Sequence, residues 1–233
     1  MVERLAEAKA LNDKGGDWDR RNRLKVYDGL LAIVQRDFKR ASGAFLDSVS
    51  TFTALELLTF EHFMFYTVLA ALKTLERPAL KKKVIDNPDV IAALTTEPLL
   101  AGLAASFYEG RYADFLHALV ELHPRLLADR YFAPHAPWYL REMRVAAYVQ
   151  FLESYKSVTL GGMAAVFGVT VRFLDEELSY LIAAGRVGAK IDAQTGVIES
   201  SRPDSKNAQY LEVIKQGDVL LNKVQRLARI ISN

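Results

Sequence analysis

Apolar residues recur at three- and four-residue steps along the first part of the chain, which is the period of amphipathic helices. From residue 23 this pattern predicts one helix, and a second begins near Asp37. The apolar positions of the first are Leu24, Tyr27, Leu30, Leu31, Val34 and Phe38, and those of the second are Ala41, Phe45, Leu46 and Val49. Small residues at Gly29 and Ala41 would let the two helices approach closely as an antiparallel hairpin.

The order of residues in this hairpin is repeated further along the chain. Gly29-Leu30 is followed by Arg36-Asp37-Phe38, and 73 residues after Gly29 the pair Gly102-Leu103 is followed by Glu109-Gly110-Arg111-Tyr112. This offset is about two helical-hairpin periods, and a third hairpin fits between the copies, beginning with a helix over residues 56–75. Such hairpins resemble tetratricopeptide-like repeats, which bury their faces by stacking. We therefore expect a mainly all-α fold with a right-handed stack of helical hairpins.

The pattern changes after Tyr155. Residues 157–159 are β-prone and precede a short helix over residues 160–167, which Gly168 can end. Thr170 fits the N-cap of a following helix. The buried face expected for that helix consists of Val171, Leu174, Leu178, Leu181 and Ile182. Two short helices joined by a turn that contains glycine predict a helix-turn-helix.

The apolar period then falls to two, which predicts β-strands. Strands are expected over residues 187–191 and 197–200, joined by a turn from Asp192 to Gly196. A helix-turn-helix followed by a β-hairpin is a winged helix, and the hairpin would expose an unpaired edge that can bind another strand. The candidate interface residues of this wing edge are Val187, Ala189, Ile191, Val197 and Ile198.

A last helix is predicted near the C-terminus of the sequence. It carries a heptad-like seam of Val213, Gly217, Leu220, Val224, Leu227 and Ile231. This apolar face must be buried, either on its own domain or in a bundle with other chains, and we favour the bundle because the helix extends past the compact unit. Its candidate interface residues are Val213, Leu220, Val224, Leu227 and Ile231. The predicted domains are the helical repeats (1–155), the winged helix (156–204) and the assembly helix (205–233).

Local signatures of catalysis are missing from the sequence. There is no Cys, which excludes disulfides, thiolate zinc sites and a Cys nucleophile. The four histidines form no His-Glu-x-x-His or His-x-His pair, and neither phosphate-binding glycine loops nor a Gly-x-Ser-x-Gly elbow occur. The run Asp175-Glu176-Glu177 is interpreted as a solvated helix face. We therefore predict no catalytic residue, no metal site and no cofactor, and a protein that is not an enzyme.

Composition and charge limit the possible partners. The chain is 51% hydrophobic and 25% charged, as in folded soluble proteins, and no apolar run reaches the roughly 18 residues of a membrane span. The presumed recognition helix, residues 170–184, holds one Arg against three carboxylates, a net charge of −2 that disfavours a nucleic-acid duplex. We expect no membrane and no nucleic-acid partner, although a winged-helix nucleic-acid-binding protein stays open as an alternative.

The order of helical repeats, winged helix and terminal helix resembles the PCI module of the proteasome lid, the COP9 signalosome and initiation-factor complexes. Several stretches are similar to one family of non-ATPase lid subunits of the 26S proteasome regulatory particle. They include residues 17–27, 45–53, 132–135, 190–192, 202–207 and 220–225, together with Arg141-Glu142-Met143-Arg144 and Ala183-Ala184-Gly185-Arg186. The first subunit of the COP9 signalosome is the nearest alternative, but it should match residues 17–27 poorly.

The resemblance implies a structural role in ubiquitin-dependent protein degradation. The partners would be other PCI subunits of the lid, joined through winged helices and a bundle of terminal helices, in the cytoplasm and the nucleus. The family also implies further helical repeats before residue 1, so we expect this chain to be a C-terminal portion. By itself it is expected to be monomeric or weakly self-associating.

Overall fold

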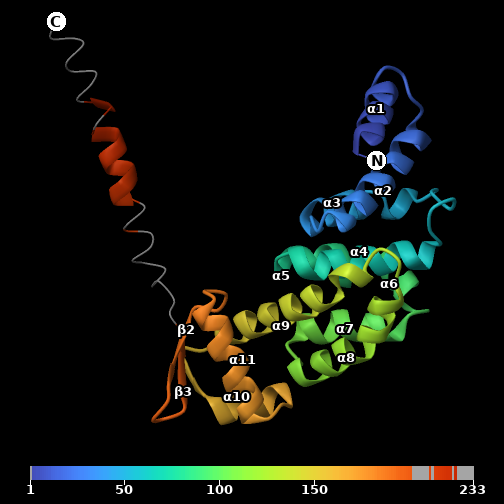
Figure 1. The fold of residues 1–233 in the computed structure, drawn as a ribbon. Coiled ribbons are helices and arrows are strands. Elements are labelled where there is room, and N and C mark those ends of the chain that lie inside the picture. Colours follow the sequence, from blue (N-terminus) through green and yellow to red (C-terminus); the bar gives the residue numbers. More distant parts are fainter. Residues whose placement is uncertain (1, 201–209, 211–212, 222, 225–233) are drawn as a thin grey trace, which may run out of the picture.

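The computed structural model describes residues 2–200, 210, 213–221 and 223–224. Its helices stack side by side in an arc that leads from α1 to a small β-sheet (Figure 1). The elements of the arc are α1 (Val2–Asp13), α2 (Trp18–Val34), α3 (Phe38–Leu46), a 3-10 turn (Val49–Thr51), α4 (Phe60–Thr74), α5 (Arg77–Leu80), a π-helical turn (Lys81–Ile85), α6 (Pro88–Leu94), α7 (Pro98–Glu109), α8 (Tyr112–Ala128), a second 3-10 turn (Ala133–His135) and α9 (Ala136–Leu152).

The two predicted copies of the hairpin end their first helices in the same way. Arg36 after α2 and Gly110 after α7 both adopt left-handed backbone angles, with φ of 64° and 79°. In each copy the next backbone amide donates a hydrogen bond back to the last turn of the helix. Asp37 N donates to Ala32 O at 2.8 Å, and Arg111 N donates to Ser106 O at 2.9 Å. The repeated sequence order therefore corresponds to a repeated helix end.

The glycines of the two copies differ in their packing. A Cβ atom on Gly29 would lie 2.4 Å from Cε1 of Phe45, so α2 and α3 approach as closely as predicted. A Cβ on Gly102 would meet no atom within 4 Å. The close approach at a glycine is therefore present in the first copy, whereas Gly102 lies on an exposed side of α7.

Several predicted details of the helices are wrong. Val34 is 50% exposed and Val171 is 48% exposed, although both were expected on buried faces. The helix expected from residue 56 begins at Phe60, because the Thr59 side chain accepts the His62 amide and caps the helix there. Each error lies at a helix end, where a terminal turn can extend beyond the neighbouring helix.

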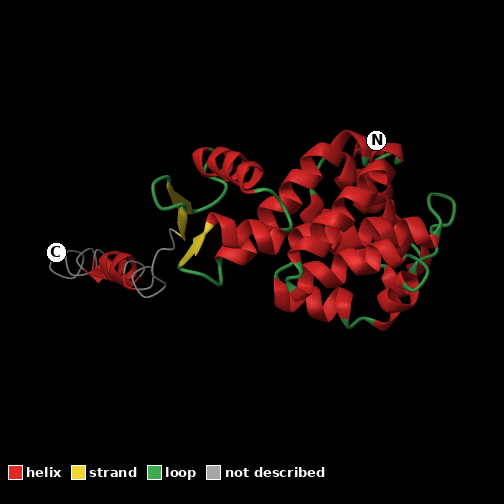
Figure 2. Cartoon of the chain, turned by 90° about the horizontal axis from the view of Figure 1, so that it is seen from below, coloured by secondary structure: helices red, strands yellow, loops and turns green. Residues whose placement is uncertain are grey.

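The winged helix has the predicted elements, with one pairing that was not predicted. β1 (Ser157–Thr159), α10 (Leu160–Phe167), α11 (Val171–Ala183), β2 (Ala189–Asp192) and β3 (Val197–Ser200) follow one another. Thr170 caps α11 by accepting the Phe173 amide, and Gly168 ends α10 with a φ of 66°. The fold class inferred from the sequence, helical repeats followed by a winged helix, is confirmed. Residues 157–159, predicted to be β-prone, form β1, and its pairing with β3, which completes a three-stranded sheet, was not predicted from the sequence (strands are yellow in Figure 2).

One hydrophobic core runs from the first helices into the winged helix. At the junction, the ring of Phe167 from α10 lies 4.7 Å from that of Tyr112, 4.9 Å from Tyr148 and 5.5 Å from Phe151, measured between centroids. These three rings belong to α8 and α9, so the winged helix shares its core with the last helices of the stack. In the part of the chain that the structure describes, no helix is long and apolar enough to cross a membrane.

We expect Gly29→Ala to lower the free energy of unfolding by about 1–3 kcal/mol, because the new methyl group overpacks the α2–α3 contact against the buried Phe45 ring. The matched control is Gly43→Ala in α3, where a Cβ meets no atom within 4 Å. That change should stabilise the chain by about 0.5–1 kcal/mol through helix propensity. Urea unfolding measures both, and equal effects of the two substitutions would contradict the close approach of α2 and α3.

Candidate functional site

The sheet of the winged helix has the order β1-β3-β2, with antiparallel pairing on both sides of β3. Ser157 lies opposite Glu199, and Lys190 lies opposite the same residue on the other side. The expectation that both hairpin strands form an exposed edge is therefore wrong for β3, which carries Val197 and Ile198. β1, close to the hairpin in space but far from it in sequence, covers that side. Within the described residues, the outer side of β2 has no strand partner.

The side chains predicted for the wing edge mostly face inward. Val187, Ala189 and Ile198 are 3%, 5% and 0% exposed and belong to the protein's own core, while Ile191 and Val197 are partly buried. Lys190 points outward from β2. What β2 offers to a partner is consequently its backbone, with Lys190 beside it, rather than an apolar side-chain surface.

The described part of the predicted C-terminal helix exposes its seam. Residues 213–221 and 223–224 are helical, and Val213, Leu220 and Val224 are 66%, 62% and 63% exposed. Leu227 and Ile231, the other two predicted interface residues, lie outside the described residues. An apolar stripe of this kind on a helix is a surface for packing against another helix.

A buried carboxylate connects the winged helix to the stack. Glu142 of α9 is 3% exposed and accepts Lys73 Nζ from α4 at 2.9 Å. The Nη2 atom of Arg186, just before β2, donates to both Glu142 oxygens at 2.7 Å. One carboxylate thus joins the stack, α9 and the segment that leads into the wing.

A second carboxylate holds the helix-turn-helix. Glu177 of α11 accepts hydrogen bonds from two groups of α9, Arg144 Nε at 2.8 Å and the Tyr148 hydroxyl at 2.6 Å. The interpretation of residues 175–177 as a solvated face is therefore wrong for Glu177. Burial and the hydrogen bond to Glu177 raise the pKa of Tyr148, so the phenol remains a proton donor in this contact.

The charges around Glu142 favour its ionised form. Burial alone would raise the pKa of Glu142, but the hydrogen bonds from Lys73 and Arg186, and the charges of both, outweigh it, so the pKa lies below its ordinary value. The same balance lowers the pKa of Asp28, which Lys9 and Arg40 contact where α1, α2 and α3 meet.

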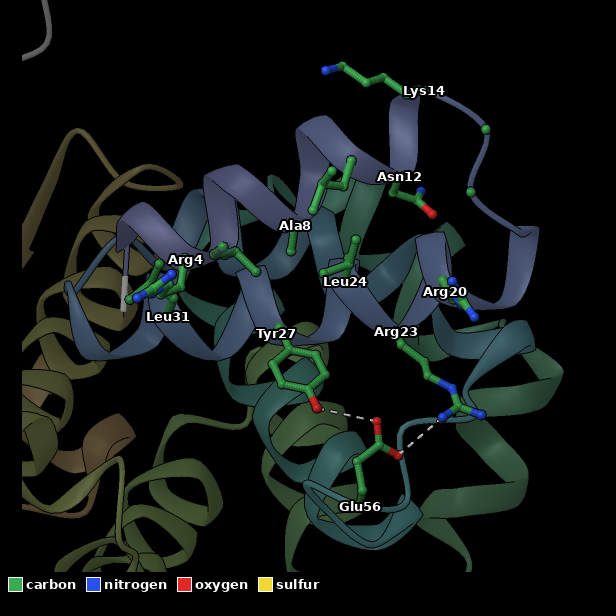
Figure 3. A pocket seen from close by; sticks show the side chains of 14 residues that line it. Arg4, Ala8, Asn12, Lys14, Arg20, Arg23, Leu24, Tyr27, Leu31 and Glu56 are labelled. Atoms are coloured by element: carbon green, nitrogen blue, oxygen red, sulfur yellow. Dashed lines mark hydrogen bonds and ion pairs between the residues drawn. The ribbon is translucent and has the colours of Figure 1, made fainter.

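An open groove of about 870 Å³ lies between α1 and α2 (Figure 3). Leu5, Ala8 and Leu24 line it, and Arg20 and Arg23 stand at its rim. Glu56 accepts a hydrogen bond from Tyr27 Oη at 3.4 Å and forms an ion pair with Arg23 Nη1 at 3.9 Å. The groove is thus lined mainly by apolar side chains, and Arg23, one of its cations, is already paired with Glu56. Within the described residues, no group of three or more His, Cys, Asp or Glu could hold a metal ion.

Sequence reasoning did not find the residues that join the winged helix to the stack. Glu142 and Arg186 lie in two of the stretches that resembled the lid family, yet they are 44 positions apart in sequence. Lys73 carries no local signal at all. A weak signal was available in Gly185-Arg186, because a glycine that ends a helix fixes the direction of the next side chain.

The matches to known families cover most of the chain. Residues 1–83 match the family described as 26S proteasome subunit RPN7, and residues 119–202 match the PCI domain. Residues 209–231 match the C-terminal helix of the 26S proteasome regulatory subunit RPN7/PSMD6. The PCI match begins within α8 and runs through α9 to the end of the sheet, so it includes Phe167, Tyr148 and Phe151 of the junction but not Tyr112.

Curated relatives give the same result. The 26S proteasome non-ATPase regulatory subunit 6 homolog of Arabidopsis thaliana is 51% identical over 97% of this chain and 59% of its own length. The 26S proteasome non-ATPase regulatory subunit 6 of Dictyostelium discoideum is 46% identical over 100% of this chain and 61% of its own length. The 26S proteasome regulatory subunit RPN7 of Saccharomyces cerevisiae is 42% identical over 97% of this chain and 54% of its own length. The chain spans between 54% and 61% of the length of these relatives.

A stack of helices that shares its core with a winged helix, and a PCI match across their junction, define a PCI-domain protein. The relatives and the two flanking matches narrow this class. The chain belongs to the RPN7 family of 26S proteasome regulatory subunits, which confirms the resemblance found in the sequence.

Glu142→Gln should change how stability depends on pH. Because the folded pKa is lowered, the unfolded chain takes up this proton first, so the stabilisation is present at neutral pH and is lost as pH falls below about 4. We expect the variant to lose on the order of 1–3 kcal/mol at pH 7 and to show a shallower fall in unfolding free energy between about pH 5 and 3. The difference should persist in about 0.5 M salt, since buried pairs are little screened. An equal dependence of the unfolding free energy on pH in the wild type and in Glu142→Gln would contradict a lowered pKa of Glu142.

Proposed function

We propose that this chain is a non-catalytic scaffold subunit of the proteasome lid, acting in ubiquitin-dependent protein degradation by binding other PCI subunits. The observation that carries the proposal is the edge of β2, which lacks a strand partner among the described residues and is held to the helical stack through Arg186 and Glu142. An edge strand binds another chain through backbone hydrogen bonds, and a rigid base sets the direction of that chain.

The exposed seam of the C-terminal helix supports a second surface. Most of the stability of a helix in a protein comes from packing its apolar face, so an exposed seam favours packing against other helices. Val213, Gly217, Leu220 and Val224 follow alternating four- and three-residue steps, which suit a helical bundle. The proposal keeps the three predicted parts, 1–155, 156–204 and 205–233. It places assembly in the last two, and without those contacts the chain would be monomeric or weakly self-associating.

The surface of α11 supports a protein partner rather than a nucleic acid. Arg172 is paired with Glu176 at 2.9 Å, and the nearby Arg144 is paired with Glu177. Neither cation is available to neutralise a phosphate without leaving its carboxylate. The proposed role uses no catalytic residue, and its expected location is the cytoplasm and the nucleus.

Val224→Asp should block assembly because it places a charge in the seam. The matched control is Val219→Asp, since Val219 is similarly exposed (53%) but does not belong to the seam. We expect capture of other lid PCI subunits, co-expressed with the chain, to fall at least about tenfold for the first variant and little for the second. Removing residues 207–233 should act like Val224→Asp and leave the fold intact. Equal recovery with both point variants would contradict the bundle, and a wild-type chain that captures no PCI subunit would contradict the scaffold role.

We expect no salt-sensitive binding of the wild-type chain to duplex DNA or RNA. The acidic carboxylates of α11 would repel a phosphate backbone, so a fluorescence titration should show no high-affinity binding even at low salt. Tight binding whose affinity falls steeply with salt concentration would instead support the winged-helix nucleic-acid-binding alternative.

A further inference from the structure

The contacts of Glu142 reach both the helical stack and the strand proposed to bind partners. We propose that Glu142 is a positioning residue: it fixes the rotation of the winged helix on the stack and thereby sets the direction of the β2 edge. The consequence for assembly rests on the proposed function. The orientation itself is a property of the chain alone and can be measured without a partner.

The turn after α11 aims Arg186 at Glu142. Gly185 has a φ of 68°, its amide donates to Ile182 O at 2.9 Å, and the Arg186 amide donates to Leu181 O at 2.8 Å. This pair of bonds is a Schellman motif, which leaves little freedom to the residue after the glycine. Since β2 begins at Ala189, the Arg186 side chain acts directly on the start of the edge strand.

Contacts with the N-terminal hairpins hold the other end of the link. Lys73 Nζ lies 5.9 Å from the centroid of the Trp138 ring, and that ring stacks on Phe38 at 5.3 Å. The Tyr139 hydroxyl also donates to Leu69 O at 2.9 Å, so α9 is fixed to α4 at two points. A continuous set of contacts therefore runs from α3 and α4 through Glu142 to the start of β2, and the part from α4 onward consists of hydrogen bonds and ion pairs.

The aromatic junction cannot set the rotation by itself. Apolar contacts depend on area and have little directional preference, so the rings around Phe167 keep α10 against α8 and α9 but tolerate some rotation. A charge-assisted bond from one guanidinium nitrogen to both carboxylate oxygens is directional. Glu177 joins α11 to α9 and contacts neither α4 nor the segment before β2. Glu142 is thus the carboxylate that connects all three parts.

Spin-label distances test the orientation directly. The chain has no Cys, so Lys82→Cys and Gln194→Cys provide two unique labelling sites, exposed on the stack and on the turn of the wing. Double electron–electron resonance then gives the distribution of distances between them. In a rigid protein this distribution is narrow, and we expect Glu142→Gln to broaden it at least about twofold.

Two further variants make the result specific. Arg186→Gln removes the other half of the link from a half-exposed position, so it tests the proposal even if Glu142→Gln fails to fold. Glu97→Gln is the matched control, because Glu97 also accepts two bonds from one guanidinium group, that of Arg125, but joins α7 to α8 away from the wing. We expect the first variant to broaden the distribution and the control to leave it narrow.

The outcomes separate this proposal from the scaffold role. Distributions as narrow as that of the wild type in Glu142→Gln and Arg186→Gln would overturn the positioning role, as would equal broadening in Glu97→Gln. We also expect both link variants to capture at least about fivefold less of the partner PCI subunits than Glu97→Gln does. Broadening without this loss would overturn the consequence for assembly. If the wild-type chain captures no partner, the scaffold role fails, while the distances still decide the positioning role.

Discussion

The packing of the winged helix against α8 and α9 is the constraint on which the rest of the structure depends. Rings from three helices meet around Phe167, and each aromatic pair contributes about 0.5–1.5 kcal/mol beyond its buried area. Buried ion pairs add little net stability, because desolvation offsets their attraction, but they are sensitive to geometry. Stability at this junction therefore comes mainly from the rings, and orientation from Glu142 and Glu177.

Carboxylates with two donors recur where elements of the stack meet. Asp28 joins α1 to α3, Glu97 joins α7 to α8, and Glu142 and Glu177 join the winged helix to the stack. In an array of stacked hairpins each unit contacts mainly its neighbours, so small rotations would accumulate along the arc. A directional contact at these four positions limits that accumulation, which matters for a protein that presents an edge strand at one end of the arc.

The sequence was sufficient for features that depend on near neighbours. Thr170 and Gly168 predicted helix ends because their chemistry acts within one turn, and the strand period located the hairpin. The sequence was insufficient where a distant segment decides. β1 is too short for its sequence to indicate which strand it pairs with, so its pairing with β3 was not predicted. Glu177 likewise looks the same in sequence whether it faces water or Arg144. The family resemblance rests on longer stretches of sequence and does not depend on knowing which distant segments are in contact.

In the proposed role, β2 is an edge strand held in a fixed direction, and another PCI subunit adds a strand to it. Hydrogen–deuterium exchange of the wild-type chain, alone and bound to a neighbouring lid subunit, tests this claim most directly. Outward-facing amides of residues 189–192 should exchange fast in the free chain and slowly in the complex, while amides of residues 197–200, paired on both sides, should be protected in both. Unchanged exchange of residues 189–192 on binding would contradict the claim.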